Sequence, residues 1–173
     1  MNRNAKPANP LPWLAAVLLA FTVVILGAYT RLSDAGLGCP DWPGCYGHVA
    51  VPTTPQAIDR ANEAYVHRPV DPSKAWKEMV HRYAAGLLGL TVLGLTIAAW
   101  RRGTGRALAT ALLLLIAFQA ALGMWTVTLM LKPLVVMGHL LGGLSVLGLL
   151  WLGYLNSRSY VPDRRPLPVI LRR

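Results

Sequence analysis

Residues 76–100 read WKEMVHRYAAGLLGLTVLGLTIAAW, an apolar run that carries a histidine, His81, near its beginning. At about 1.5 Å per residue, a helix of this length crosses a hydrocarbon core of about 30 Å. Three further apolar runs occupy residues 11–29, 107–128 and 133–155. Because lipid excludes unpaired backbone polar groups, helices are the simplest spanning structure. The sequence therefore predicts an all-α fold, an integral membrane four-helix bundle.

The composition supports a membrane protein surrounded by lipid. Hydrophobic residues make up 54% of the 173-residue chain and charged residues only 14%, with a mean hydropathy of +0.44. The net charge of +10 raises the alternative of a nucleic-acid partner. A nucleic-acid interface needs a basic face on a folded module, whereas most of the basic residues here flank the apolar runs. We therefore expect no nucleic acid as a partner.

The positions of the charged residues predict the orientation in the membrane. Ten of the 17 Lys and Arg residues lie in three groups, at residues 3–6, 101–106 and 158–173, which four spans place on one side. Positive charge marks the cytoplasmic side, and six of the seven acidic residues fall on the other side. We expect a cell inner membrane protein with both termini in the cytoplasm. Its predicted parts are an N-terminus, a membrane domain with an outer loop, and a basic tail, at residues 1–10, 11–155 (loop 31–75) and 156–173.

The outer loop contains the chain's two cysteines, Cys39 and Cys45, in a stretch rich in Gly and Pro that forbids a continuous helix. An oxidising compartment and the short spacing favour a disulfide between them. A redox role is the sharper alternative, and a zinc site lacks two further ligands. Further along the loop, the apolar spacing in residues 55–67 predicts a short amphipathic helix on the membrane surface.

His81 and a second intramembrane histidine, His139, lie at similar depth on helices that run in the same direction. Small residues follow each histidine within a turn, at 84–85 and 142–143, and leave space for a flat macrocycle. Neutral imidazoles are suitable iron ligands, so the pair predicts a heme held from both sides. The alternative is that the small residues serve close helix packing and that each imidazole bonds to a neighbouring helix.

Other polar residues near this level have two interpretations each. Glu78 lies one turn outward from His81 and would handle protons at the porphyrin edge, or would only favour the helix dipole. Arg31 and Arg82 would pair with heme propionates, or would only reach the polar interface. Gln119 lies in the third apolar run and needs a hydrogen-bond partner, for which a neighbouring helix would serve.

Together these residues resemble the heme A synthase family. The resemblance covers all four apolar runs and the outer loop in order. The matching stretches are 27–32 (GAYTRL), 35–43 (AGLGCPDWP), 78–82 (EMVHR), Gln119 with 122–127 (LGMWTV), and 138–143 (GHLLGG).

The resemblance implies an enzyme of heme A biosynthesis that oxidises a methyl group of heme O to a formyl group. It implies that His81 and His139 flank the substrate heme, that Glu78 is a catalytic carboxylate, and that Cys39 and Cys45 form the outer-loop pair. The implied partners are membrane lipid, heme O, an electron donor and heme O synthase.

One departure from the family pattern concerns its second half. Family members have eight helices in two halves, and a second histidine pair holds a heme b cofactor. This sequence matches the N-terminal half, so we expect a half-size form that pairs with itself or with a C-terminal-half partner, or else a truncated product. The rival functions are a non-catalytic heme-binding or electron-transfer module and an assembly partner of a terminal oxidase.

Overall fold

The computed structural model describes residues 9–158, which form five helices and no strand. Four helices are long and apolar enough to cross a membrane. A short helix lies in the outer loop, between the first and second long helices. The bounds are α1 (Leu11–Leu32), α2 (Pro55–Ala64), α3 (Pro72–Arg102), α4 (Arg106–Thr128) and α5 (Pro133–Ser157). The predicted all-α fold with four spanning helices is confirmed, and the chain is a multi-pass membrane protein.

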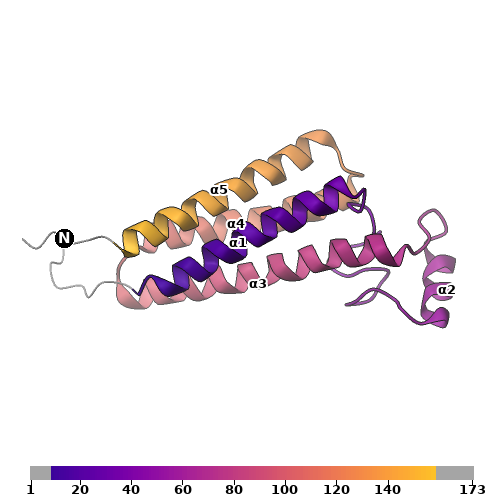
Figure 1. Ribbon diagram of the computed structural model, residues 1–173, viewed down its shortest axis with the longest axis horizontal. Coiled ribbons are helices and arrows are strands. Elements are labelled where there is room, and N and C mark those ends of the chain that lie inside the picture. Colours follow the sequence, from indigo (N-terminus) through magenta and orange to yellow (C-terminus); the bar gives the residue numbers. More distant parts are fainter. Residues whose placement is uncertain (1–8, 159–173) are drawn as a thin grey trace, which may run out of the picture.

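The long helices form a four-cornered bundle in which consecutive helices run in opposite directions (Figure 1). Helix α1 packs against α3 and α5, and α4 packs against the same two helices. Helices α3 and α5 are therefore diagonal neighbours whose backbones do not pack against each other. Since both run from the outer loop toward the opposite end, their histidine-bearing parts face each other across the middle of the bundle.

Two apolar clusters lie at different levels of the bundle. The inner cluster joins all four long helices, with Ala16, Val92, Leu112 and Leu150 among its buried members. Lipid tails are as apolar as these side chains, so close packing rather than the hydrophobic effect holds such helices together. The outer cluster packs the disulfide loop and α2 onto the first turns of α3.

Local signals set the ends of α3. Pro72 occupies the first turn, and the side chain of Asp71 accepts a hydrogen bond from the backbone N–H of Lys74 at 3.1 Å. Such an N-cap is worth about 1 kcal/mol. Gly103 ends the helix with a φ of +75°, a left-handed conformation that glycine adopts without strain. Helix α3 thus begins four residues before the apolar run at 76–100, because proline and its cap extend it outward.

The helix predicted in the outer loop is present as α2, which ends three residues before the expected boundary at 67. The side chain of Thr54 accepts a hydrogen bond from the N–H of Ala57 and caps its beginning. Figure 1 shows α2 beyond the outer end of the bundle.

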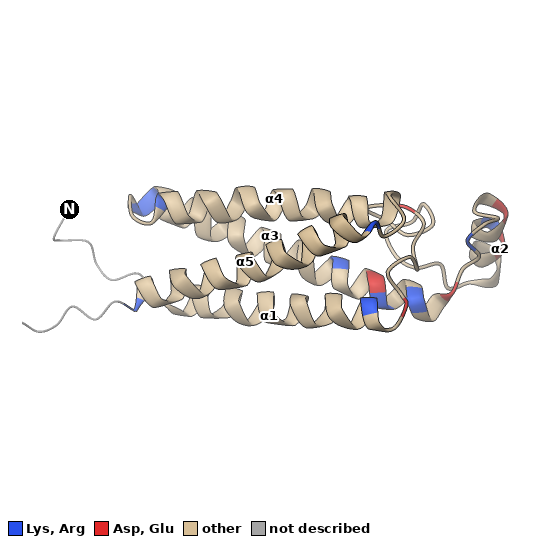
Figure 2. Cartoon of the chain, turned by 90° about the horizontal axis from the view of Figure 1, so that it is seen from above, with Lys and Arg blue, Asp and Glu red and all other residues tan. Residues whose placement is uncertain are grey.

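Charged residues are sparse along the bundle and concentrate at its ends (Figure 2). Arg101, Arg102 and Arg106 lie at the end where α1 begins and α5 finishes, opposite the outer loop. The other two predicted basic groups are in residues 1–10 and 156–173, most of which fall outside the described residues. The described part of the chain therefore has the uneven charge distribution that the sequence predicted.

Candidate functional site

His81 on α3 and His139 on α5 approach each other across the bundle. Their ring centroids are 6.4 Å apart, and the ring planes are nearly perpendicular, at 89°. An imidazole nitrogen binds a metal at about 2 Å, so two rings that share one metal have centroids about 6 Å apart. The separation of the two rings fits a single metal ion bound between them.

A glycine on a neighbouring helix lies behind each histidine. A Cβ on Gly27 of α1 would come within 2.9 Å of Cε1 of His81. A Cβ on Gly123 of α4 would come within 3.4 Å of Cε1 of His139. The two glycines therefore make room for the imidazoles, and they lie in the stretches GAYTRL and LGMWTV.

Both imidazoles are partly buried and incompletely bonded. The Nδ1 atoms of His81 and His139 have no hydrogen-bond partner among the residues that the structure describes. Buried polar atoms in native proteins are almost always paired. A metal bond to one ring nitrogen would compensate for part of this deficit, so the donor set fits a heme iron.

A cavity of about 1320 Å³ surrounds the two histidines. Residues from all four long helices and from the outer loop line it, and most of them are apolar. Ala85 and Gly89 beyond His81, and Gly143 and Val146 beyond His139, are among the lining residues. The cavity exceeds the range of about 300–1,000 Å³ that is usual for ligand pockets, so it has room for a large apolar ligand.

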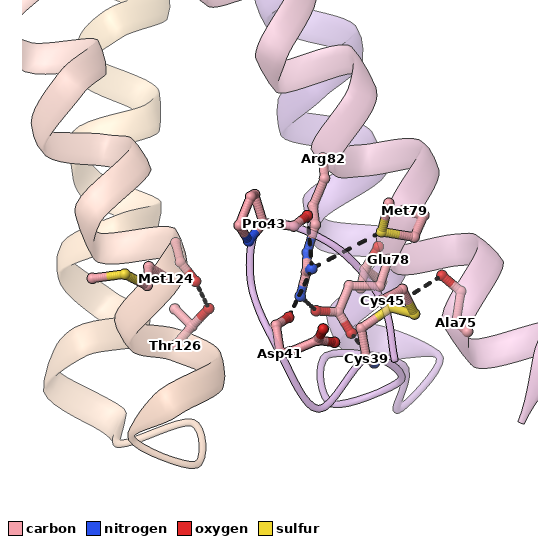
Figure 3. Close-up of polar contacts among 12 residues, drawn as sticks. Cys39, Asp41, Pro43, Cys45, Ala75, Glu78, Met79, Arg82, Met124 and Thr126 are labelled. Atoms are coloured by element: carbon pink, nitrogen blue, oxygen red, sulfur yellow. Dashed lines mark hydrogen bonds and ion pairs between the residues drawn. A yellow bond between two sulfur atoms is a disulfide. The ribbon is translucent and has the colours of Figure 1, made fainter. Parts of the chain in front are cut away.

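Glu78 and Arg82 connect α3 to the outer loop (Figure 3). The carboxylate of Glu78 is buried, accepts a hydrogen bond from the N–H of Cys39 at 3.0 Å, and pairs with the guanidinium of Arg82. Arg82 also donates to the carbonyl oxygen atoms of Asp41, at 3.0 Å, and of Gly44. One ion pair thus fixes the loop to the helix. Glu78 lies in the second turn of α3, so it is not the residue that caps the helix.

The outer loop is compact because it is held internally as well. Cys39 and Cys45 form a disulfide, which confirms the predicted pair. The carboxylate of Asp41 accepts hydrogen bonds from the N–H groups of Tyr46, at 2.6 Å, and Gly47, at 2.7 Å. Burial raises the pKa of the Tyr46 phenol, which donates to a backbone carbonyl at 3.1 Å.

The two arginines that were candidates for propionate binding differ in their surroundings. Both line the cavity. Arg82 is mostly buried and its guanidinium is engaged by Glu78 and by loop carbonyl groups. Arg31, at the outer end of α1, is exposed, and its guanidinium makes no hydrogen bond or ion pair within residues 9–158. Of the two, Arg31 has the guanidinium free for a carboxylate ligand.

Sequence reasoning missed two features of this site. It did not identify Gly27 and Gly123 as the residues behind the histidines, although both lie in stretches that were singled out. It also expected a neighbouring helix to satisfy Gln119, whose amide nitrogen and oxygen are buried without a partner in the described residues.

Comparison with known proteins gives the family. The family described as cytochrome oxidase assembly protein (COX15-CtaA) matches residues 12–172 of the chain. The chain belongs to this family. This match covers all four long helices and the outer loop, and it includes every residue of the site described above.

Several relatives of the chain carry names connected with heme. A heme A synthase of Shewanella oneidensis is 53% identical over 151 residues, which are 86% of this chain and 46% of that protein. A heme A synthase of Halalkalibacterium halodurans is 29% identical over 99% of this chain and 51% of its own length. A protoheme IX farnesyltransferase of Halobacterium salinarum is 30% identical over 73% of this chain and 24% of its own. The chain spans about half the length of the two heme A synthases.

Proposed function

We propose that the chain binds heme between His81 and His139 and takes part in heme A biosynthesis, as an oxidoreductase that converts a methyl group of heme O to a formyl group. The 6.4 Å separation of the two rings inside a large apolar cavity is the observation that carries the proposal. The name of two relatives, heme A synthase, supplies the product, and heme O as the substrate follows from the family resemblance.

The conversion requires a reactant beyond the heme. The methyl carbon loses two hydrogen atoms and gains one oxygen atom, which is a four-electron oxidation. With dioxygen as the oxidant, two successive hydroxylations each consume one O2 and two electrons from the electron donor and release one water, and the resulting geminal diol loses a third water to leave the formyl group. Heme would supply the redox-active iron, held by the imidazoles of His81 and His139. The protein's own part is to hold the macrocycle, to exclude water with the surrounding apolar helices, and to place charged groups at the outer edge.

We assign Glu78 the role of catalytic carboxylate and Arg31 and Arg82 the role of propionate partners. Glu78 lines the cavity at its outer end, near the level of His81. Glu78 also has a structural role, because its ion pair with Arg82 holds the loop that covers the outer side of the cavity. Arg31 is the stronger propionate candidate because its guanidinium is unoccupied among the described residues. A guanidinium binds a carboxylate through two parallel hydrogen bonds, which makes an arginine well suited to a propionate group.

We further propose an inner membrane location with both termini in the cytoplasm. The basic residues at the end opposite the outer loop support this orientation. The proposed partners are an electron donor, heme O synthase as the source of heme O, and a second copy or a C-terminal half. Such a half would supply a further histidine pair for heme b.

Pigment analysis tests the proposal. The chain is co-expressed with a source of heme O, purified, and its extracted hemes are separated by chromatography. Heme A supports the enzyme, and low-spin heme without heme A supports a carrier instead. Protein that contains no heme contradicts both and leaves the structural role in oxidase assembly.

Variants at the histidines give the matched test of the site. His81→Ala or His139→Ala should abolish or alter the low-spin heme spectrum, whereas His67→Ala should not, because His67 is exposed in the outer loop and does not line the cavity. An unchanged spectrum in both cavity variants would show that the heme lies elsewhere.

A further inference from the structure

Gln119 of α4 is the least satisfied polar side chain in the described part of the bundle. It is 8% exposed, and neither its amide nitrogen nor its amide oxygen has a hydrogen-bond partner there. The residue lines the cavity that contains the histidines. An amide can donate two hydrogen bonds and accept two, so a large capacity for polar contacts is left unused in an apolar surrounding.

The neighbouring helix makes space for this amide without bonding to it. A Cβ on Gly142 of α5 would overlap the Gln119 side chain, so only glycine permits the amide to lie there. Glycine offers no side-chain partner, and its backbone groups belong to the helix. The sequence predicted that a neighbouring helix would hydrogen-bond the Gln119 amide, and no such bond is made at this contact.

The depth of Gln119 relative to the histidines indicates which part of a ligand it would meet. Gln119 precedes Gly123, which lies behind His139, by four residues, or about 6 Å along the axis of α4 toward the inner end. Gly142 lies three residues beyond His139 in the same direction. The charged Arg31 lies at the outer end of the cavity. A tetrapyrrole whose carboxylates face the outer interface therefore turns its opposite edge toward Gln119.

We propose that Gln119 hydrogen-bonds a hydroxyl or carbonyl group on the inward edge of the bound tetrapyrrole, and so selects a hydroxyl-bearing heme over protoheme. This inference rests on the proposed heme site and names the substrate feature that the site reads. Heme O carries a hydroxyl group at the base of its farnesyl chain, where protoheme has a plain vinyl group. A site built to hydrogen-bond a ligand hydroxyl disfavours the analogue that lacks it, because its own polar group then stays unpaired.

The test compares the ratio of two affinities across variants of the full chain in lipid nanodiscs. Heme O and protoheme are each titrated into the wild type and into Gln119→Met, which keeps the length of the side chain and removes its polar atoms. The contribution of the farnesyl chain cancels when the ratios are compared, since both proteins offer it the same contacts. We expect the preference for heme O to fall about tenfold in the variant, the size of one buried hydrogen bond.

Thr126→Val is the matched control. Thr126 also lines the cavity, but its hydroxyl already donates to the carbonyl of Gly123 at 2.7 Å, so the ratio should stay as in the wild type. Gln119→Leu repeats the test with a second apolar side chain, in case Gln119→Met does not assemble.

Each remaining outcome decides between the two proposals. A ratio unchanged in both Gln119 variants, with the wild type binding heme, overturns the inference and leaves the heme site standing. An equal loss of both hemes with an altered low-spin spectrum shows that Gln119 acts through His139, and this also overturns it. A wild type that binds neither heme refutes the proposed function itself.

Discussion

Replacing Gly27 with alanine should disable the heme site without weakening the helix that carries it. Gly27 lies in α1, and the Cβ of an alanine would be 2.9 Å from Cε1, 3.4 Å from Nδ1 and 3.5 Å from Nε2 of His81. Alanine is a better helix former than glycine by about 1 kcal/mol. The substitution therefore tests the position of the imidazole separately from the stability of the fold.

The size of the effect follows from the contact distance. Carbon atoms pack comfortably at about 3.5–4.0 Å, so the imidazole of His81 must move by about 0.6–1.1 Å. Functional groups have to be held within about 0.5 Å of their working position. In the apoprotein the imidazole can move aside, so the overpacking cost of about 1–3 kcal/mol arises when heme binding requires the ring to return to its ligating position. This cost corresponds to a loss of about 5- to 150-fold in heme affinity.

The assay is an optical titration of purified apoprotein with heme, together with thermal unfolding of the same apoprotein. Gly94→Ala is the control, because Gly94 lies in α3 and a Cβ there meets no atom within 4 Å. We expect Gly94→Ala to bind as the wild type does, and Gly27→Ala to bind weakly or with an altered low-spin spectrum at an undiminished unfolding temperature. Wild-type affinity and spectrum in Gly27→Ala would mean that His81 does not hold the heme.

Three further predictions address the packing, the loop and the outer surface. Gly153→Ala should lower the unfolding temperature by the equivalent of about 1–3 kcal/mol, because the ring of Trp13 occupies the space of the new Cβ. Gly94→Ala should show no such loss. Arg82→Leu should destabilise the protein by about 3–5 kcal/mol and speed proteolysis of the outer loop, because it leaves the buried carboxylate of Glu78 unpaired. A loop as resistant as in the wild type would show that the ion pair does not hold it. Lys74 on α3 holds the pKa of Asp34 below its ordinary value of 3.8 through a hydrogen bond and its charge. This contact therefore stabilises the fold at neutral pH, and the stabilisation is lost as the pH falls through the lowered pKa. Asp34→Asn should therefore lower the unfolding temperature slightly at pH 7 and by progressively less as the pH falls below 3.8, and an effect that does not diminish with acidification would contradict the assignment.

A substitution of Glu78 affects two features of the site at once, because this residue pairs with Arg82. Removing the carboxylate takes away a candidate proton-handling group and at the same time an anchor of the outer loop. Glu78→Gln keeps the shape and can still accept the hydrogen bond from Cys39. Loss of formyl production with retained heme and an intact loop would therefore support catalysis, whereas a loosened loop would show that the residue acts through the loop.

Hydropathy and charge along the chain were sufficient to predict the fold. A segment such as 76–100 has one low-energy arrangement in lipid, because every backbone polar group must be paired within the segment itself. Four such segments in succession must cross the membrane in alternating directions. An antiparallel bundle is the simplest arrangement that results. The disulfide and the α2 helix were likewise predictable, since they depend on neighbours within the loop.

Only the tertiary structure decided which residues meet across the bundle. The placement of Gly27 behind His81, the coupling of Arg82 to loop carbonyl groups 38–41 residues away in the sequence, and the unpaired amide of Gln119 all depend on how helices are rotated against each other. Hydropathy does not set that rotation, because every face of these helices is apolar. It is set by the fit of small against large side chains, which is a property of pairs of helices and not of any one segment.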